Sequence, residues 1–336
     1  MNDSDFNFME TASFTVGELS GKGVENFKIS EVGDRHHGKK VLLFLDEESK
    51  GYVVKPRQGV GEQILADIEE YVLGEIGIKV TTNKPLLNSA QFSIYDYIKE
   101  EKINNNNLDT FFFLYGIKGA ILFCLLATDI GNENVVVTNA SGPVIIDAET
   151  ILSPYKLELN LKKAKYDLNF DYCTLARTGF FPSNYIFSPL VSSKQIDCIK
   201  NSGAEGLTAV FEKYPVCDSY LENIFHGFRV GADVLQKSMR IIDDVLSMHE
   251  ISELRVIIRP TRIYINNLLS PSDIDFNQEE LNQMSKGDIP YFTYKSIGCS
   301  LNKIEILNAI GGMIRFCRKN KSFIERQIYE AGYGIN

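Results

Sequence analysis

The sequence has few of the residues that build metal and disulfide sites. Its six cysteines are scattered and form no CxxC pair, and none of its four histidines has zinc-ligand spacing with a cysteine. Zinc sites need such clusters of Cys and His. We therefore expect no zinc site, and we expect the cysteines to be free thiols in the cytosol.

Long apolar runs and an excess of positive charge are also missing. The first residues, MNDSDFNFMETASF, are polar and acidic, unlike the basic and apolar start of a secretory signal. The longest apolar stretch, Ala120 to Ala127, is too short to cross a bilayer. The formal net charge is −9, whereas nucleic-acid and anionic-membrane binders need a cationic surface. These absences predict a cytoplasmic protein with no membrane span and no nucleic-acid partner.

The chain does contain enough apolar sequence for a sizeable core, since hydrophobic residues make up 44% of its 336 residues. In its first part, KVLLFLDEESKGYVVKPR predicts a β-hairpin, because two β-rich runs flank a polar turn. Residues 61–73 carry apolar side chains at helical spacing, and residues 90–98 predict a further strand. Residues 1–100 are thus predicted to be a small β-rich lobe.

Residues 101–336 are predicted to form a larger, mainly helical lobe, with the boundary near residues 99–107. The expected elements are a buried helix at 108–128, short strands at 134–138 and 143–147, and helices at 220–250 and 301–330. This organisation is an α+β, two-lobed fold like that of lipid and protein kinases.

Lys55 is the first candidate for binding phosphate. It ends the second strand of the hairpin in GYVVKPR, and Arg57 follows it. A lysine at the end of a buried strand points one fixed way, as the phosphate-binding lysine of kinases does. The alternative is that Lys55 and Arg57 mark a polar strand end.

ATDIGNENVVV carries the second candidate group. Asp129 follows a long apolar helix, and Asn134 opens a strand five residues later. In kinases, a catalytic-loop aspartate accepts the proton of the substrate hydroxyl and an asparagine farther along the same loop holds a metal ion. The alternative is an ordinary Asp/Asn-rich turn.

GPVIIDAETI carries the third group. If this segment is a strand through Asp147, then Asp147 and Glu149 face the same side. Two carboxylates on one face repel unless a cation lies between them, and Mg²⁺ suits such ligands. The alternative is an exposed acidic strand end. The order of the three groups along the chain is more specific than any one of them.

Seven segments in order resemble the dehydratase domain of LanM-type, or class II, lanthipeptide synthetases. They are GDRHHGKKV, VVKPR, ATDIGNEN, VIIDAETI, RTGFFP, RVIIRPTRIY and GDIPYF, and they span residues 32–292. The resemblance implies a lipid-kinase-like enzyme that uses ATP and Mg²⁺. Such an enzyme phosphorylates Ser and Thr of a ribosomal precursor peptide and then eliminates phosphate to leave dehydroalanine or dehydrobutyrine.

The resemblance also implies roles for individual residues. Lys55, with Arg57 beside it, would bind nucleotide phosphate, and Asp129 would be the catalytic aspartate. The implied metal ligands are Asn134 and Asp147, assisted by Glu149. The implied elimination residues are Arg255 and Thr261, and His36 matches a further active-site histidine.

Local geometry supports the elimination group. Pro260 disfavours helix and biases Arg259 toward extended backbone. On a strand, Arg255, Arg259 and Thr261 would share one face, and two guanidiniums with a hydroxyl suit a phosphate leaving group. The alternative is a basic strand that faces solvent.

The chain departs from the resemblance in three ways. Gly131 stands where the dehydratases usually have histidine, so histidine-assisted catalysis is not expected. The motifs begin close to the N-terminus, which predicts a truncated domain. No Cys/His cluster for a zinc-dependent cyclase is present, which predicts a stand-alone dehydratase that works with a separate cyclase or other modifying enzymes.

Three functions remain open from the sequence. The first is the bifunctional dehydratase. The second is a kinase without lyase activity, acting on a peptide or a small molecule. The third is a catalytically silent pseudokinase that binds a precursor peptide for other enzymes.

Overall fold

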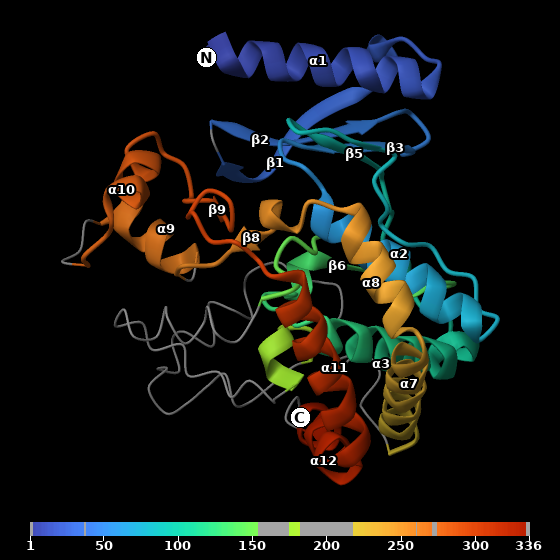
Figure 1. Cartoon of the computed structure of the whole chain (residues 1–336). Helices are drawn as coiled ribbons and strands as arrows, with labels where there is room; N and C mark the ends of the chain where they lie inside the picture. Colours follow the sequence, from blue (N-terminus) through green and yellow to red (C-terminus); the bar gives the residue numbers. More distant parts are fainter. Residues whose placement is uncertain are drawn as a thin grey trace. The chain divides into compact units, whose positions relative to one another are not determined.

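The computed structural model describes residues 3–36, 38–153, 175–181, 218–259, 261–270 and 274–333. The chain forms two compact units (Figure 1). The sheet unit comprises Met1–Val60, Lys84–Tyr97 and Ser252–Ser300. The helical unit comprises Gly61–Asn83, Ile98–Ile251 and Leu301–Asn336. Together they give a mixed α/β protein with a small antiparallel sheet and several helices.

The sheet unit is built on an antiparallel sheet with strand order β1-β2-β3-β5-β4. The strands are β1 (Lys28–His36), β2 (Lys39–Leu45), β3 (Gly51–Lys55), β4 (Leu87–Asn88) and β5 (Ser93–Asp96). The predicted hairpin is confirmed as β2 and β3, which pair with Leu42 opposite Val54. The strand predicted at 90–98 is confirmed as the shorter β5.

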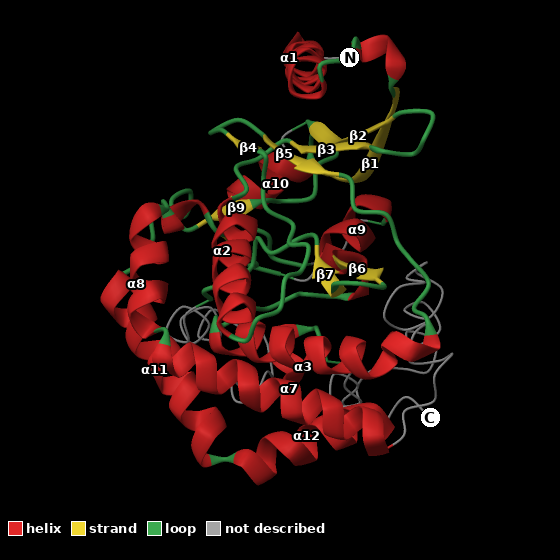
Figure 2. Ribbon diagram, turned by 90° about the vertical axis from the view of Figure 1, so that its right-hand side faces the viewer, coloured by secondary structure: helices red, strands yellow, loops and turns green. Residues whose placement is uncertain are grey.

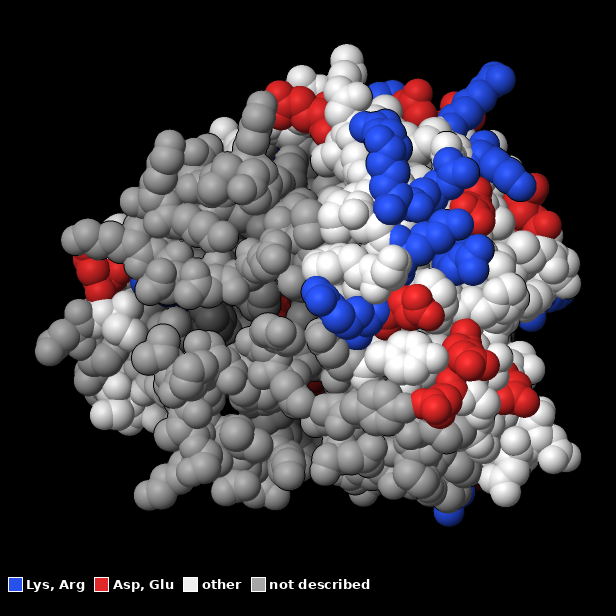
Figure 3. All heavy atoms as spheres, turned by 90° about the horizontal axis from the view of Figure 1, so that it is seen from below, with Lys and Arg blue, Asp and Glu red and all other residues white. Residues whose placement is uncertain are grey.

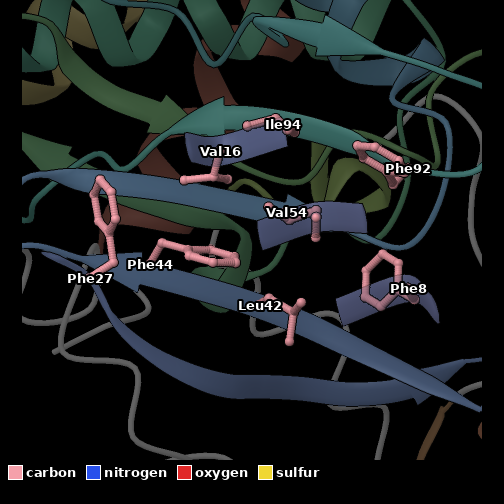
Figure 4. Packing of buried hydrophobic residues seen from close by; sticks show 9 residues of the cluster. Phe8, Val16, Phe27, Leu42, Phe44, Val54, Phe92 and Ile94 are labelled. Atoms are coloured by element: carbon pink, nitrogen blue, oxygen red, sulfur yellow. The ribbon is translucent and has the colours of Figure 1, made fainter. Parts of the chain in front are cut away.

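Helix α1 (Asp3–Ser20) packs on one face of this sheet, although the sequence predicted no helix there. Phe8, Ala12 and Val16 recur every four residues and so form one apolar stripe. Figure 4 shows Phe8 and Val16 beside the strand residues of the same cluster. The buried members of that cluster are Phe8, Ala12, Val16, Phe27, Leu42, Phe44, Val54, Phe92 and Ile94. Full burial of one large apolar side chain contributes about 1.5–3 kcal/mol, so this stripe accounts for the position of α1.

The remaining described elements of the sheet unit are short strands and short helices. It contains β8 (Arg255–Val256), α9 (Thr261–Leu269), α10 (Gln278–Met284) and β9 (Phe292–Thr293), and β8 pairs with β9. Asn277 begins α10 with a capping box, in which its side chain accepts from the Glu280 N–H and Glu280 accepts from the Asn277 N–H.

The helical unit contains the longer helices and one β-hairpin. Its helices are α2 (Val60–Glu75), α3 (Leu108–Cys124), α7 (Asp218–Lys237), α8 (Met239–Met248), α11 (Lys303–Lys319) and α12 (Lys321–Tyr333). The hairpin consists of β6 (Val135–Thr138) and β7 (Gly142–Ile145). The helix predicted at 61–73 is confirmed as α2. The helices predicted at 220–250 and 301–330 are each two helices, divided at Ser238 and Asn320.

Helices α3 and α7 lie side by side along their lengths (Figure 2). Two glycines permit this approach. A Cβ on Gly116 would lie 2.0 Å from the Ile224 carbonyl oxygen, and one on Gly227 would lie 2.0 Å from the Phe113 carbonyl oxygen. The buried helix predicted at 108–128 is therefore confirmed as α3, which ends at Cys124.

The segment Asn105–Cys124 has the length and hydropathy of a membrane span. In the structure, 78% of it is buried inside the protein. That burial is typical of a core helix, because a lipid-facing helix would leave its apolar side chains uncovered by protein.

Candidate active site

The predicted site residues are divided between the two units. The sheet unit holds His36, Lys55, Arg57, Arg255 and Thr261, and the helical unit holds Asp129, Asn134, Asp147 and Glu149. Within the helical unit, the four residues lie on two short segments that flank the β6–β7 hairpin.

The first segment is the loop from α3 to β6. Asp129 is exposed and has a φ of 58°, a left-handed conformation that aspartate adopts more readily than most residues. The Asn134 side-chain amide donates to the Asp129 carbonyl oxygen at 2.7 Å. The Ile130 N–H donates to the Thr178 carbonyl oxygen at 2.8 Å. These bonds fix the loop that carries the predicted catalytic aspartate.

The second segment follows β7 and is bound to the first at both ends. The Ile146 N–H donates to the Asn134 carbonyl oxygen at 2.8 Å, and the Thr128 N–H donates to the Thr150 carbonyl oxygen at 3.1 Å. The Thr150 hydroxyl donates in turn to the Thr128 carbonyl oxygen. The structure therefore brings Asp129 and Asn134 onto a segment adjacent to the one that carries Asp147 and Glu149.

The predicted strand geometry of the two carboxylates is wrong. Strand β7 ends at Ile145, so Asp147 and Glu149 lie in a turn beyond it and do not alternate as strand residues. Asp147 is half-buried and Glu149 is buried. Helix α2 packs against this turn so closely that a Cβ on Gly61 would lie 2.1 Å from the Ala148 carbonyl oxygen.

The donor chemistry of the two segments fits Mg²⁺, because carboxylate and amide oxygens are the hard ligands that this ion prefers. Asn134 uses its side-chain nitrogen on Asp129, which orients its side-chain oxygen as the remaining acceptor. Within the described ranges, no group of three or more His, Cys, Asp or Glu residues is placed to hold a metal ion. A site here would therefore combine Asn134 with carboxylates and with oxygens of other molecules, as magnesium sites in phosphoryl-transfer enzymes do.

In the sheet unit, Lys55 ends β3, the central strand, and is buried. Its ammonium lies 5.3 Å from the centroid of the Tyr95 ring, which holds the side chain on one side of the sheet. Arg57 is half-buried, and its backbone is held because the Ser93 hydroxyl donates to the Arg57 carbonyl oxygen at 2.9 Å.

His36 ends β1, where a tight turn joins it to Lys39 in β2. Asp288 holds this turn, since the Gly38 N–H lies 3.1 Å from each of its carboxylate oxygens. The Arg35 guanidinium lies 3.5 Å from the same carboxylate. Asp288 belongs to GDIPYF, yet the sequence alone assigned it no role. The structure draws attention to Asp288 because it is an acidic residue that is almost completely buried.

The strand predicted through Arg255, Arg259 and Thr261 is also wrong. Strand β8 ends at Val256, and Thr261 is the first residue of helix α9. Arg255 is half-buried, and its guanidinium lies 5.2 Å from the centroid of the Tyr291 ring. Pro260, on which the prediction relied, lies outside the described residues.

Arg259 forms a buried ion pair, so it does not belong to the group of residues predicted to bind phosphate with Arg255 and Thr261. Its Nε donates to Glu280 at 2.6 Å, and the two side chains are 4% and 0% exposed. The Tyr264 hydroxyl donates to the same carboxylate at 2.8 Å. Burial and this carboxylate raise the pKa of Tyr264 well above its ordinary value, so its hydroxyl stays protonated.

Gly131 lies in the loop between Asp129 and Asn134 and has space beside it. The atoms nearest to a Cβ at this position would be those of the flexible Glu133 carboxylate, the closest at 2.8 Å. Its φ is not positive, so the backbone conformation does not require glycine. A Cβ at position 131 therefore needs a shift of the Glu133 side chain.

Comparison with known protein families supplies one match. The model of a family described as "Domain of unknown function (DUF4135)" matches residues 11–215. This family is associated with LanM-like lanthipeptide synthetases. No curated protein matches the chain.

Proposed function

We propose, on the premise that the chain belongs to the DUF4135 family, that it is an ATP-dependent dehydratase of Ser and Thr in a ribosomally made precursor peptide. The observation that carries the proposal is the pairing of two segments in the helical unit. Hydrogen bonds at Thr128 and Thr150, and at Asn134 and Ile146, hold a carboxylate loop beside an acidic turn. A base on the loop beside metal ligands on the turn would suit phosphoryl transfer.

In the first half-reaction, Asp129 accepts the proton of the substrate hydroxyl as the hydroxyl oxygen forms a bond to the γ-phosphorus of ATP. The bond between the γ-phosphorus and the β,γ-bridging oxygen breaks, and ADP leaves. Lys55 and Arg57 bind the nucleotide phosphates. Asn134 and Asp147 would hold Mg²⁺, with Glu149 assisting. An ion held there would neutralise charge on the phosphate oxygens.

In the second half-reaction, a base removes the α-proton of the phosphorylated residue, the Cβ–O bond breaks and phosphate leaves. The guanidinium of Arg255 stabilises the departing phosphate, because it offers planar, permanently charged donors. Thr261 acts in the same step. His36 is a further active-site residue, and Asp288 binds the nearby Gly38 N–H.

The kinase-like, two-lobed fold is part of the same proposal. Its support is the antiparallel sheet with a buried lysine at the end of the central strand, together with the loop and hairpin that carry Asp129 and Asn134. The sheet unit would correspond to the small lobe and the helical unit to the large lobe. The partners proposed for the chain are the precursor peptide and a separate cyclase or other modifying enzymes.

One observation favours a second candidate, a kinase without lyase activity. Arg259 is held by Glu280 inside the sheet unit, so the elimination group has one arginine fewer than the sequence predicted. With Arg255 and Thr261 serving only as structure, the chain would phosphorylate a peptide or a small molecule and stop there.

Intact mass spectrometry separates these functions. The full chain is incubated with ATP, Mg²⁺ and a candidate precursor peptide encoded beside its gene. The dehydratase proposal predicts loss of whole water molecules from the peptide. Asp129→Asn should slow all modification about 10²–10⁴-fold, because it removes the base.

Arg255→Ala should give phosphorylated peptide that is not dehydrated. The matched control is Arg240→Ala, which removes an exposed arginine of α8 and should leave the products unchanged. Phosphate addition alone by the unaltered chain supports the kinase. An unchanged peptide that nevertheless binds supports a silent binding module.

A further inference from the structure

The segment RTGFFP, which is one of the seven that resemble the dehydratase domain, takes no part in the proposed reaction. The structure describes it as far as Phe181, within residues 175–181 of the helical unit. Arg177, Thr178, Phe180 and Phe181 are all buried, although two of them are polar or charged. We call residues 175–181 the buried segment.

Two phenylalanines fix the buried segment to the middle of α3. The Phe180 ring stacks on the ring of Tyr115 in α3, with 4.4 Å between the ring centroids. The Phe181 ring meets the same tyrosine edge-on, with 5.3 Å between the centroids. The Tyr115 hydroxyl also donates to the Phe180 carbonyl oxygen. Aromatic pairs in these arrangements attract one another in addition to burying apolar area, so they hold the segment on the helix.

Arg177 fixes the buried segment to the end of α3. Figure 3 shows Lys and Arg side chains at the surface on the face seen from below, with Asp and Glu side chains beside them. Arg177 is buried instead, and its guanidinium donates to the Phe123 carbonyl oxygen at 2.7 Å. The last carbonyls of a helix lack partners within the helix and carry negative partial charge, so a cation stabilises this end. The loop that carries Asp129 begins directly after it.

The buried segment contacts that loop next to Asp129. The Ile130 N–H donates to the Thr178 carbonyl oxygen at 2.8 Å. Gly179 has a left-handed φ of 74°, and a Cβ there would lie 2.9 Å from the Ile130 nitrogen and 3.2 Å from its carbonyl carbon. Backbone atoms cannot rotate away as the end of a side chain can, so this contact requires glycine.

The Thr178 hydroxyl fixes the backbone on both sides of Gly179. It donates to the Leu175 carbonyl oxygen at 2.7 Å and accepts from the Phe180 N–H at 3.1 Å. Both bonds are buried, where a lost partner leaves a polar group unsatisfied. They therefore hold the Thr178 carbonyl oxygen in place to accept from Ile130.

We propose that Thr178 and Gly179 are positioning residues of the candidate active site, which hold Asp129 in place through the neighbouring Ile130. Asp129 has a φ of 58°, and a left-handed residue other than glycine persists only where its surroundings fix it. The bond and the close contact at Ile130 supply that constraint. The role of Asp129 as a base rests on the proposed function, whereas its loop is held by contacts that the structure shows.

Amide hydrogen exchange in the full chain, measured at Ile130, tests whether the loop is held in this way. Gly179→Ala should speed exchange at Ile130 about tenfold, because the new Cβ displaces the Ile130 backbone and weakens its bond to Thr178. The amides of α7 should exchange as in the parent chain.

The matched control is Gly77→Ala. Gly77 has a φ of 73°, so alanine brings the same backbone strain as at Gly179, but no atom lies within 4 Å of a Cβ there. Exchange at Ile130 should therefore stay unchanged in this variant.

The kinetics of peptide phosphorylation with ATP and Mg²⁺ test the consequence for the reaction. Gly179→Ala and Thr178→Val should lower kcat about tenfold to a hundredfold with little change in KM for ATP, because a misplaced base slows the chemical step. Thr178→Ser keeps the hydroxyl and should restore most of kcat. A purely structural role would lower the Tm of Thr178→Val and leave kcat of the folded protein unchanged.

Three results would overturn the inference. The first is exchange at Ile130 that is the same in Gly179→Ala as in the parent chain. The second is equally faster exchange at Ile130 and throughout α7, which would show general destabilisation. The third is faster exchange at Ile130 alone with an unchanged kcat. If the parent chain phosphorylates no peptide, the proposed function fails, and exchange at Ile130 still decides whether the buried segment holds the loop.

Discussion

Lys118 in α3 and Glu69 in α2 form a buried ion pair whose removal should have a large and pH-dependent effect on stability. The Lys118 ammonium lies 3.2 Å from one Glu69 oxygen, and the two side chains are 0% and 3% exposed. The other Glu69 oxygen has no hydrogen-bond partner among the described residues. The pattern within either helix does not reveal this pair, because the two residues are 49 positions apart in the sequence.

Burial raises the pKa of the Glu69 carboxyl, and attraction to Lys118 only partly opposes this. The cost of removing the carboxylate from water therefore exceeds what the pair returns. Because the folded chain holds the Glu69 proton more tightly than the unfolded chain, this group lowers the free energy of unfolding as the pH rises through the raised pKa.

Removing one partner leaves the other buried and uncompensated. We expect Glu69→Gln to lower the free energy of unfolding by about 3–5 kcal/mol, which corresponds to a drop in Tm on the order of 10 °C. The double variant Glu69→Leu/Lys118→Met removes both charges and should be at least as stable as the parent chain. Thermal and urea unfolding, followed by circular dichroism, measure these differences.

The pH dependence of the losses tests the raised pKa of Glu69. In Lys118→Met, the lone carboxyl can be neutralised by binding a proton, so its loss of stability should shrink as the pH falls. In Glu69→Gln the loss should also shrink as the pH falls, because a protonated Glu69 in the parent chain no longer forms an ion pair with Lys118. A loss below about 1 kcal/mol in Glu69→Gln at neutral pH, or losses that do not shrink at low pH, would refute this reasoning.

Three further predictions concern the loop, the acidic turn and the thiols. Gly131→His should keep the parent Tm, because the atoms nearest to the new Cβ belong to the flexible Glu133 side chain, and should raise the rate of peptide phosphorylation; a large loss of Tm by calorimetry would contradict the first part. Gly61→Ala should lower both Tm and that rate, because the new Cβ meets the Ala148 carbonyl oxygen at 2.1 Å; an unchanged rate would show that the turn is not part of the site. A hydrogen bond with Cys317 and burial raise the pKa of the Cys124 thiol, so iodoacetamide should label the half-buried Cys299 before Cys124; peptide mapping showing the reverse order would contradict this.

Most helices and strands could be predicted because the spacing of their apolar residues matches the side of each element that is buried. The β2–β3 hairpin follows from two β-rich runs around a polar turn, and α3 follows from a continuous apolar segment that the core buries on all sides. Helix α1 was missed because its polar, acidic start obscured the stripe of Phe8, Ala12 and Val16. Only the sheet beneath α1 gives that stripe a partner.

The breaks within long helical segments depended on local bonds that the apolar pattern does not show. At Ser238, between α7 and α8, the hydroxyl donates to the Val234 carbonyl oxygen at 2.7 Å, which competes with the regular helical bonds. Asn320 likewise ends α11. The apolar stripe of Ile306, Ile310, Ile314 and Cys317 is buried and lies entirely within α11, before this break.

The candidate site shows the same division between local and tertiary information. Motif order identified the segments of Asp129 and Asp147, and the structure places those segments side by side. The strand predicted through Arg255 and Thr261 ends at Val256, and Arg259 is bound by Glu280, a residue 21 positions away in the sequence. Spacing within one segment cannot reveal such a partner.

The most direct test of the central claim is a time course of intact peptide mass with the full chain, ATP and Mg²⁺. The account predicts that a phosphorylated peptide appears first and then declines as dehydrated peptide accumulates. Mass loss in the absence of ATP, or a phosphorylated peptide that never declines, would contradict a single chain that both phosphorylates and eliminates.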